Sequence, residues 1–344
     1  MIILNILRLS LYIVGLLVIV TTYGLTTEFL YFICLGNYFI KINKVDLIIK
    51  KYFGCAYLFL LNMVGLNFYI KGKVIKNRVL WISNHRSKLD GLLLQSIICS
   101  KNHTIRVVTK KAIQYIPLFG TIGNHVKNIF IDRGNDKARQ TLSNVIPDLI
   151  ENNESVLIFP EGATMSYQNK NISDDYINEH NLPKLSNLLR PRHWGFSNIV
   201  SNGSYNIIGN IVTKYDSIDS TSQHSFLELV TNFPTKTYID IQYKNINTDL
   251  DSIFERNDKL INNMYHSIVN IGNDRNSINH NEYIKMSWFD MYDKALENIA
   301  INITLSFLSI CFIYFFPYAS LTIIVISILR LYYGIFIDNT ISAS

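Results

Sequence analysis

Apolar residues are concentrated at the two ends of the chain. Near the N-terminus they form runs over residues 2–20 and 29–35, and near the C-terminus over residues 299–316 and 319–335. A helix needs about 20 apolar residues to span a bilayer. The pattern therefore predicts membrane-embedded helices at the N-terminus and a transmembrane hairpin at the C-terminus. A cleaved signal peptide is the less favoured interpretation, because no small-x-small cleavage site clearly ends the N-terminal runs.

A further apolar stretch, residues 52–69, is rich in aromatic residues and is interrupted by glycine and asparagine. Two interpretations are open for it: a buried core helix, or a segment half embedded at the membrane surface. The lysines that precede the stretch suit an anionic cytoplasmic leaflet, and they are Lys41, Lys44, Lys50 and Lys51.

Between residues 71 and 290 the pattern changes to short β-branched runs that alternate with polar, helix-forming stretches. The predicted strands are residues 79–83, 104–109, 128–131, 155–159, 205–213 and 237–243, and the predicted helices are 89–100, 136–152 and 254–271. Pro147 is expected to kink or split the second helix. The alternation predicts an α/β fold, with a mainly parallel sheet flanked by helices. The predicted organisation is N-terminal membrane-associated helices over 1–70, an α/β domain over 71–290 and a C-terminal hydrophobic hairpin over 291–344.

The composition narrows the class of protein. Of the 344 residues, 49% are hydrophobic and 17% are charged. Soluble domains carry about a quarter charged residues, so an ordinary soluble globule is disfavoured, and the hydrophobicity excludes a disordered chain. Four cysteines are too few for a disulfide scaffold. The net charge of +6 fits an anionic membrane surface or a phosphorylated substrate, whereas no dense Lys/Arg block predicts a nucleic-acid partner. The sequence has no cluster of metal-binding residue types, so it does not predict a metal site.

Three polar motifs follow predicted strands. In parallel α/β sheets, active-site residues lie beyond the carboxyl ends of the strands. In the first motif, His85 comes at the tip of a strand and Asp90 follows five positions later. The two can meet only if His85 lies in the turn and Asp90 in the first turn of the next helix. The carboxylate then fixes the imidazole tautomer, and His85 serves as a general base. The structural alternative is a capping box, in which Ser87 is the N-cap and Asp90 the third helical residue.

The other two motifs end their strands with residues suited to an anion or a turn. Arg133 has the planar donor geometry that binds phosphate, and Gly134 allows close approach of the backbone. A surface ion pair is the alternative for Arg133. The third motif is a Pro-Glu-Gly turn that contains Glu161 and Gly162, and such a turn can simply end a strand. Together the three motifs predict one cleft with a base, an anion clamp and a turn.

In this order and spacing, the three motifs resemble those of the glycerophospholipid acyltransferase family, the 1-acylglycerol-3-phosphate acyltransferases. The matching segments are NHRSKLD at residues 84–90, FIDRG at 130–134 and FPEG at 159–162. The resemblance extends to the segment before the second motif, at residues 115–120, and to the branch that contains lysocardiolipin acyltransferase, at residues 188–196 and 233–236.

The resemblance implies an acyl-CoA-dependent transfer to the free hydroxyl of a lysophospholipid. It makes His85 the base, Asp90 its orienting partner and Arg133 the ligand of the acceptor's phosphate. The base removes the hydroxyl proton as the oxygen attacks the thioester. No acyl-enzyme is needed, because the acceptor is itself the nucleophile, and the sequence has no Gly-x-Ser-x-Gly motif. Acyl-CoA is then a co-substrate, and neither a cofactor nor a metal is expected.

The resemblance also implies roles for the third motif and for a fourth. Glu161 and Gly162 shape the acceptor site, and Pro191 belongs to the acyl-donor site. One position departs from the family, which commonly has Thr directly after Glu-Gly. This chain has Ala163 there and Thr164 one position later, so the contacts with the acceptor are expected to differ.

The expected reaction converts 1-acyl-sn-glycerol-3-phosphate to phosphatidic acid at a lipid bilayer. The alternatives are a remodelling enzyme for lysocardiolipin or lysophosphatidylinositol, a glycerol-3-phosphate acyltransferase, and a non-catalytic membrane scaffold with the same fold. The expected location is the endoplasmic reticulum or another endomembrane. There the protein is integral to the membrane, with the catalytic domain facing the cytosol, where acyl-CoA is available.

Overall fold

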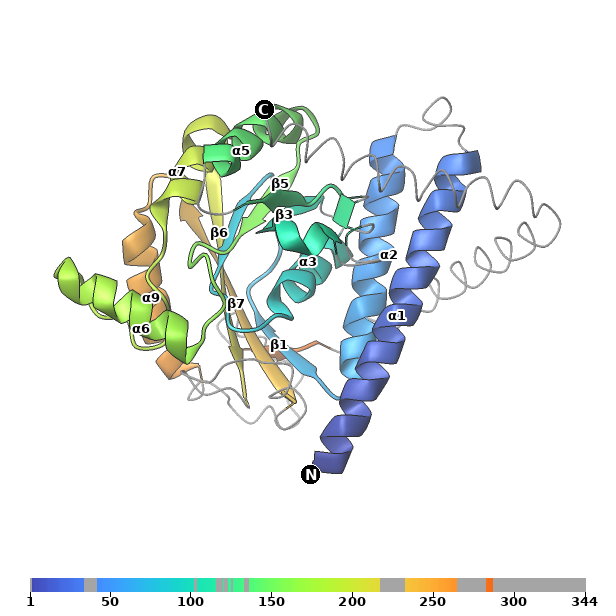
Figure 1. Cartoon of the computed structure of the whole chain (residues 1–344), viewed down its shortest axis with the longest axis horizontal. Helices are drawn as coiled ribbons and strands as arrows, with labels where there is room; N and C mark the ends of the chain where they lie inside the picture. The colour runs from blue at the N-terminus through green and yellow to red at the C-terminus, as the bar shows by residue number, and fades with distance from the viewer. Residues whose placement is uncertain are drawn as a thin grey trace, which may run out of the picture.

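One eight-stranded sheet organises the described part of the chain, in the order β4-β3-β5-β2-β6-β7-β1-β8 (Figure 1). The computed structural model describes residues 2–33, 42–101, 104–115, 120, 123–124, 126–132, 136–216, 233–264 and 283–286. The strands are β1 (Asn67–Lys71), β2 (Leu80–Ser83), β3 (Ile105–Lys110), β4 (Ile129–Ile131), β5 (Ser155–Ile158), β6 (Ile207–Tyr215), β7 (Lys236–Asn245) and β8 (Ile284–Lys285). β6–β7 and β1–β8 pair antiparallel and the other neighbours pair parallel. The predicted mainly parallel sheet is confirmed.

Helices cover both faces of this sheet, as predicted (Figure 1). The helices are α1 (Ile2–Ile33), α2 (Ile42–Met63), α3 (Asp90–Ser100), α5 (Asp136–Glu151), α6 (Tyr167–Glu179), α7 (His193–Asn202) and α9 (Leu250–Asn263), with a 3₁₀ turn η1 at Lys111–Tyr115. α1, α2 and α3 share one hydrophobic cluster with the sheet. α5, α7 and α9 share the other.

Alternation along the strands explains the two clusters, because successive side chains of a strand point to opposite faces. In β2, Trp81 belongs to the cluster beneath α2 and α3, whereas Leu80 and Ile82 belong to the cluster on the other face. All four residues of β2 are buried. Such continuous burial is typical of a central parallel strand covered on both sides.

α2 resolves the alternative that the sequence left open for residues 52–69. Tyr57 and Leu61 are fully buried, and the helix lies so close to α3 that a Cβ on Gly54 would be 3.0 Å from the Cα of Ser96. The buried-helix interpretation is therefore correct for the described side chains. The sequence pattern did not predict the strand at the end of this stretch: residues 67–71 form β1, which pairs with β7.

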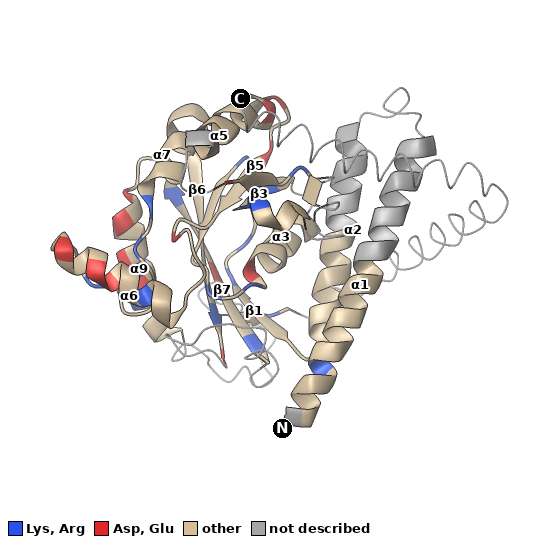
Figure 2. Ribbon diagram, viewed as in Figure 1, with Lys and Arg blue, Asp and Glu red and all other residues tan. Residues whose placement is uncertain are grey.

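α1 carries an apolar face on its outer side. The described side chains of this helix include one charge, Arg8 (Figure 2), and its outward apolar residues include Ile3, Leu7, Val14 and Val18, which are 58–83% exposed. Within the residues that the structure describes, no helix combines the length and the apolar character needed to cross a bilayer. The predicted C-terminal hairpin at 291–344 lies outside the described residues.

Two predicted helices differ in detail from the structure. α5 runs through Pro147 without being split. α9 begins at Leu250, four residues earlier than predicted, because the side chain of Asp249 caps it by accepting a hydrogen bond from the backbone N–H of Ser252 at 2.9 Å.

The closeness of β6 to β2 gives a test of the fold. A Cβ on Gly209 would lie 2.3 Å from Cε3 of the buried Trp81, so Gly209→Ala is expected to destabilise the protein by about 1–3 kcal/mol. Gly195→Ala on α7 is a matched control, since a Cβ at that position would have nothing within 4 Å. Denaturant unfolding of the full chain measures both, and equal stability of the two variants would contradict the packing described for the sheet.

Candidate active site

Three neighbouring parallel strands, β5, β2 and β6, bring the candidate residues to one edge of the sheet. His85 follows β2, Glu161 follows β5 and Tyr215 ends β6. Since the carboxyl ends of parallel strands meet at one edge, residues far apart in the sequence become neighbours. Two of the three predicted motifs therefore meet, as the sequence indicated.

His85 and Asp90 form a direct pair. His85 Nδ1 lies 3.1 Å from Asp90 Oδ2, and Asp90 is fully buried whereas the His85 side chain is 18% exposed. The geometry is the one the spacing required, with His85 in the turn and Asp90 as the first residue of α3. The Asp90 carboxylate accepts a hydrogen bond from Nδ1–H of His85. This keeps the ring proton on Nδ1 and leaves Nε2 as the basic nitrogen.

The same carboxylate also organises the turn. Asp90 Oδ2 accepts hydrogen bonds from the backbone N–H groups of Arg86 (2.6 Å) and Ser87 (2.7 Å), and Ser87 Oγ accepts one from the N–H of Leu89 (3.2 Å). The predicted capping box is only half formed, because in that motif Ser87 Oγ would accept from the N–H of Asp90. The Asp90 N–H instead donates to the backbone carbonyl of Ser87 at 3.1 Å, and the helix begins at Asp90 with Leu89 as its N-cap. Asp90 therefore organises the turn through backbone N–H groups while it also pairs with His85.

The other nitrogen of His85 faces a hydroxyl. Thr164 Oγ1 lies 3.1 Å from His85 Nε2, and Phe159 stacks on the imidazole with ring centroids 4.4 Å apart. With Nδ1 protonated, Nε2 accepts the proton of the Thr164 hydroxyl. The family resemblance drew attention to Ala163, but the structure shows that Thr164 is the residue that touches the base, a contact that sequence spacing did not indicate.

Glu161 supports the histidine from its backbone side. Its Oε1 accepts a hydrogen bond from the N–H of His85 at 3.1 Å, and its residue is 2% exposed. Burial raises the pKa of Glu161 to about 8, against the opposing effects of the His85 N–H and the Arg86 guanidinium. At neutral pH the side chain is therefore largely protonated and neutral.

Gly162 and the fourth motif complete the turn. Gly162 has φ +68°, and a Cβ there would lie 3.0 Å from Cδ of Arg192, so both conformation and space favour glycine. The N–H of Arg192 donates to the carbonyl of Pro160 at 2.8 Å, and Pro191 is buried beside it. The fourth motif thus packs directly on the third.

The structure describes the second motif only as far as Asp132. Arg133 and Gly134 lie outside the described residues. β4, the strand before them, is at the edge of the sheet beyond β3 and β5. Among the described residues, no group of three potential ligands could hold a metal ion.

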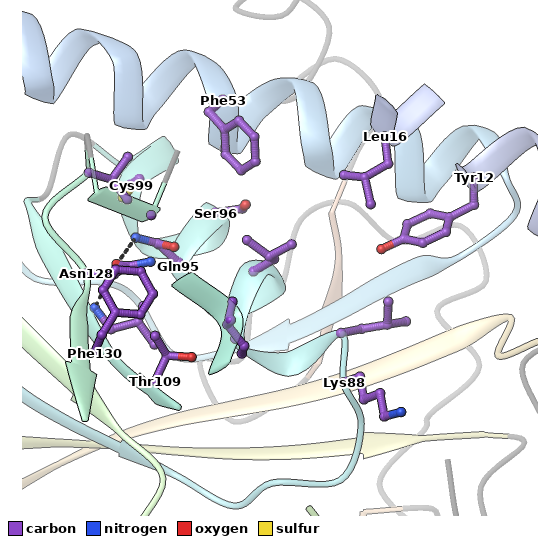
Figure 3. Close-up of a pocket in the computed structure, with 18 of the residues that line it drawn as sticks. Tyr12, Leu16, Phe53, Lys88, Gln95, Ser96, Cys99, Thr109, Asn128 and Phe130 are labelled. Atoms are coloured by element: carbon purple, nitrogen blue, oxygen red, sulfur yellow. Dashed lines mark hydrogen bonds between the residues drawn. The ribbon is translucent and has the colours of Figure 1, made fainter. Parts of the chain in front are cut away.

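A cavity of about 700 Å³ opens beside the His85–Asp90 turn (Figure 3). Lys88 and Leu89 line it at the turn, and the rest of its wall comes from α1, α2, α3, β3, η1, β4 and the segment before β4. Figure 3 places Tyr12 and Lys88 at one end, and Asn128 and Phe130 at the other. Most of the lining is apolar, and the volume is in the range of small-molecule sites.

Comparison with known proteins identifies the family of this part of the chain. The family model described as Acyltransferase matches residues 65–212. Residues 65–212 carry an acyltransferase domain. The domain includes β2, α3 and β5 with the turns that hold His85, Asp90 and Glu161. The resemblance stated from the motifs is therefore confirmed.

Individual relatives of this acyltransferase domain are distant. The chain is 26% identical over 207 residues to a probable 1-acyl-sn-glycerol-3-phosphate acyltransferase 5 from Arabidopsis thaliana, covering 55% of this chain and 54% of that protein. It is 26% identical over 186 residues to lysocardiolipin acyltransferase 1 from Gallus gallus, covering 52% and 48%. The chain thus spans about half the length of these relatives. The crystal structure of the 1-acyl-sn-glycerophosphate acyltransferase PlsC from Thermotoga maritima shares the fold, with a TM-score of 0.50 and 13% identity over 78% of this chain and 98% of that one.

The raised pKa of Glu161 predicts how stability depends on pH. The folded state keeps a proton that the unfolded chain releases near pH 4.5, so the contribution of Glu161 to stability falls as the pH rises from about 4.5 to 8. Glu161→Gln keeps the acceptor oxygen and removes this titration. We expect the variant to lose less stability than the parent protein between pH 5 and pH 8, measured by thermal unfolding.

The exposed Glu179 at the end of α6 provides the control. Glu179→Gln makes the same chemical change at a solvated position and should leave the pH dependence of unfolding unchanged. Parallel curves for the parent protein and Glu161→Gln would show that Glu161 does not carry a buried proton.

Proposed function

We propose that the protein transfers a fatty acyl group from acyl-CoA to the free hydroxyl of a lysophospholipid, with 1-acyl-sn-glycerol-3-phosphate as the acceptor and phosphatidic acid as the product. The observation that carries the proposal is the placement of His85. Its Nδ1 is held by the buried Asp90, and its Nε2 already makes a hydrogen bond with an alcohol, the hydroxyl of Thr164.

In the proposed reaction, the acceptor hydroxyl replaces Thr164 at Nε2 of His85. Nε2 takes the hydroxyl proton while the oxygen attacks the thioester carbon of acyl-CoA. Asp90 stabilises the imidazolium that forms. The tetrahedral oxyanion then collapses, the C–S bond breaks, and the CoA thiolate leaves and takes the proton from the His85 imidazolium, which returns the base to its neutral form. General-base assistance of this kind contributes about 10²–10⁴-fold, and positioning of the two substrates contributes more.

The cavity beside the turn supports an acyl substrate. Its lining includes Leu9 and Leu16 from α1 and Phe53 from α2, so a hydrocarbon chain placed there would be removed from water. The cationic Lys88 stands at the end near the base, where it would meet a phosphate of either substrate. We assign the acyl chain to this cavity, and we retain Arg133 and Gly134 as the proposed ligands of the acceptor phosphate.

The exposed apolar face of α1 supports the proposal that the reaction takes place at a lipid surface. Ile3, Leu7 and Val14 are more than half exposed, and an apolar patch of this kind marks a membrane or protein contact. We propose that this face contacts the membrane that supplies the acceptor, with the site open to cytosolic acyl-CoA. Lysocardiolipin is the second candidate acceptor, because the relative from Gallus gallus is named for it.

His85→Ala tests the proposal directly. The full-length protein is mixed with acyl-CoA and a panel containing lysophosphatidic acid, lysocardiolipin, lysophosphatidylinositol and glycerol 3-phosphate, and thiol release and lipid products are measured by absorbance and mass spectrometry. We expect transfer to fall by at least about 10²-fold in the variant, with vesicle binding unchanged. Turnover near the parent level would refute the base assignment, and no product from any acceptor would refute the function.

A substitution that narrows the cavity tests whether the acyl chain binds there. Thr109 lines it at the end away from Lys88 (Figure 3), so Thr109→Trp is expected to reduce kcat/KM for palmitoyl-CoA by about tenfold or more while octanoyl-CoA remains a substrate. Ile172→Trp on the exposed face of α6 is the control. An unchanged chain-length preference would place the acyl group elsewhere.

A further inference from the structure

A tyrosine from β6 makes the fourth hydrogen bond to the Asp90 carboxylate. The Tyr215 hydroxyl donates to Asp90 Oδ1 at 2.5 Å, whereas His85, Arg86 and Ser87 all contact Oδ2. Tyr215 is 1% exposed and Asp90 is fully buried. The two carboxylate oxygens therefore have different partners: Oδ2 contacts the base and its turn, and Oδ1 accepts the hydrogen bond from Tyr215.

The fold holds Tyr215 in place through the sheet. β2 pairs with β6 up to Ser83 and Ile211. Beyond that point, the Asn84 amide continues the pairing with its side chain. Asn84 Nδ2 donates to the carbonyl of Thr213 at 2.9 Å, and Asn84 Oδ1 accepts from the N–H of Thr213 at 2.8 Å. Tyr215 follows two positions later, on the same face of the strand as Thr213. The His85 turn and the end of β6 are thus locked together.

Helices α1 and α2 enclose the tyrosine from outside. Tyr57 on α2 is fully buried, and its hydroxyl lies 3.0 Å from that of Tyr12 on α1. Burial, with the negative charge of Asp90, raises the pKa of Tyr215 well above its usual value of 10. The hydroxyl therefore remains a proton donor over the whole range in which a histidine titrates.

We propose that Tyr215 is a positioning residue: it fixes the orientation of the Asp90 carboxylate and, by sharing its negative charge, limits the proton affinity of His85. A donor at Oδ1 withdraws charge from the carboxylate, and a less negative carboxylate stabilises the imidazolium less. Loss of the donor makes His85 easier to protonate, and it also frees the carboxylate to turn away from Nδ1. The effect on turnover rests on the proposed function, but the effect on the titration of His85 does not.

Tyr215→Phe leaves the other titratable and charged side chains around the His85–Asp90 pair unchanged. Those nearby in the described structure are Arg86 and Lys88 in the turn, Tyr12 and Tyr57 on the helices, Glu161 after β5, Arg192 in the fourth motif and Lys214 on β6. Glu161 titrates near pH 8. A difference between the parent protein and a Tyr215 variant therefore isolates the contribution of the tyrosine hydroxyl.

Tyr215→Phe removes this hydroxyl alone. The full chain, labelled with ¹³C at histidine Cε1, is titrated by NMR in detergent micelles, and the signal of His85 is assigned by its loss in His85→Gln. We expect the midpoint of the His85 titration to move to higher pH by about half a unit or more in Tyr215→Phe. In turnover, kcat should fall by about tenfold while the KM for acyl-CoA changes little.

Tyr205→Phe is the matched control. Tyr205 is also buried, and its hydroxyl also donates a hydrogen bond, to the carbonyl of Glu154 at 3.0 Å, but it lies roughly 30 Å away, before the other end of β6. A merely structural role for Tyr215 would lower the unfolding temperature in both variants and leave the His85 midpoint in place. An unmoved midpoint in Tyr215→Phe, or an equal movement in Tyr205→Phe, overturns the proposal.

A second substitution covers the case in which Tyr215→Phe does not fold. 3-Fluorotyrosine at position 215 keeps the shape and makes the hydroxyl a stronger donor, so the His85 midpoint should move to lower pH. Absence of that movement also overturns the proposal. If the parent protein transfers no acyl group to any acceptor, the proposed function fails, and the titrations still decide the role of Tyr215.

Discussion

The buried carboxylate of Asp90 is the feature on which the site depends. An ionised group without exposure to water is tolerated only where donors replace the solvent. Here two backbone N–H groups, the imidazole and the Tyr215 hydroxyl supply them, and the start of α3 adds a favourable helix dipole. One side chain thereby ties together the turn after β2, the helix that follows it and the end of β6. Any change that removes a donor disturbs the fold and the base together.

Glu161, the second carboxyl group of the site, is kept protonated rather than ionised. Glu161 is buried and accepts a hydrogen bond from the backbone N–H of His85, and its pKa is raised to about 8. Two carboxyl groups on either side of one histidine are thus placed in different environments, a pattern that separates their roles in acid–base sites. A neutral Glu161 shapes the backbone of His85 without adding a second negative charge, so Asp90 supplies the charge that polarises the imidazole.

Local patterns in the sequence were enough to predict this pair but not its surroundings. The strand, turn and helix around His85 and Asp90 are encoded within a short segment, and a five-residue spacing permits one arrangement only. Tyr215 and Thr164 lie 125 and 79 positions from their partners. No periodicity links residues so far apart, because their contact depends on which strands become neighbours. The burial of α2 was likewise undecided, since an apolar aromatic stretch suits a core and a membrane surface equally.

α1 connects the proposed lipid surface to the proposed acyl site. Leu9, Tyr12 and Leu16 face inward and line the cavity, while Leu7 and Val14 point outward, a division that follows from the 3.6-residue period of the helix. The wall of the cavity on this side is therefore one helix thick. Tyr12 also contacts Tyr57, which lies near the Asp90 charge. If the outer face rests on lipid, α1 borders both the surface that supplies the acceptor and the cavity for the acyl chain. Through the contact of Tyr12 with Tyr57 on α2, it is also linked to the surroundings of Asp90 on α3.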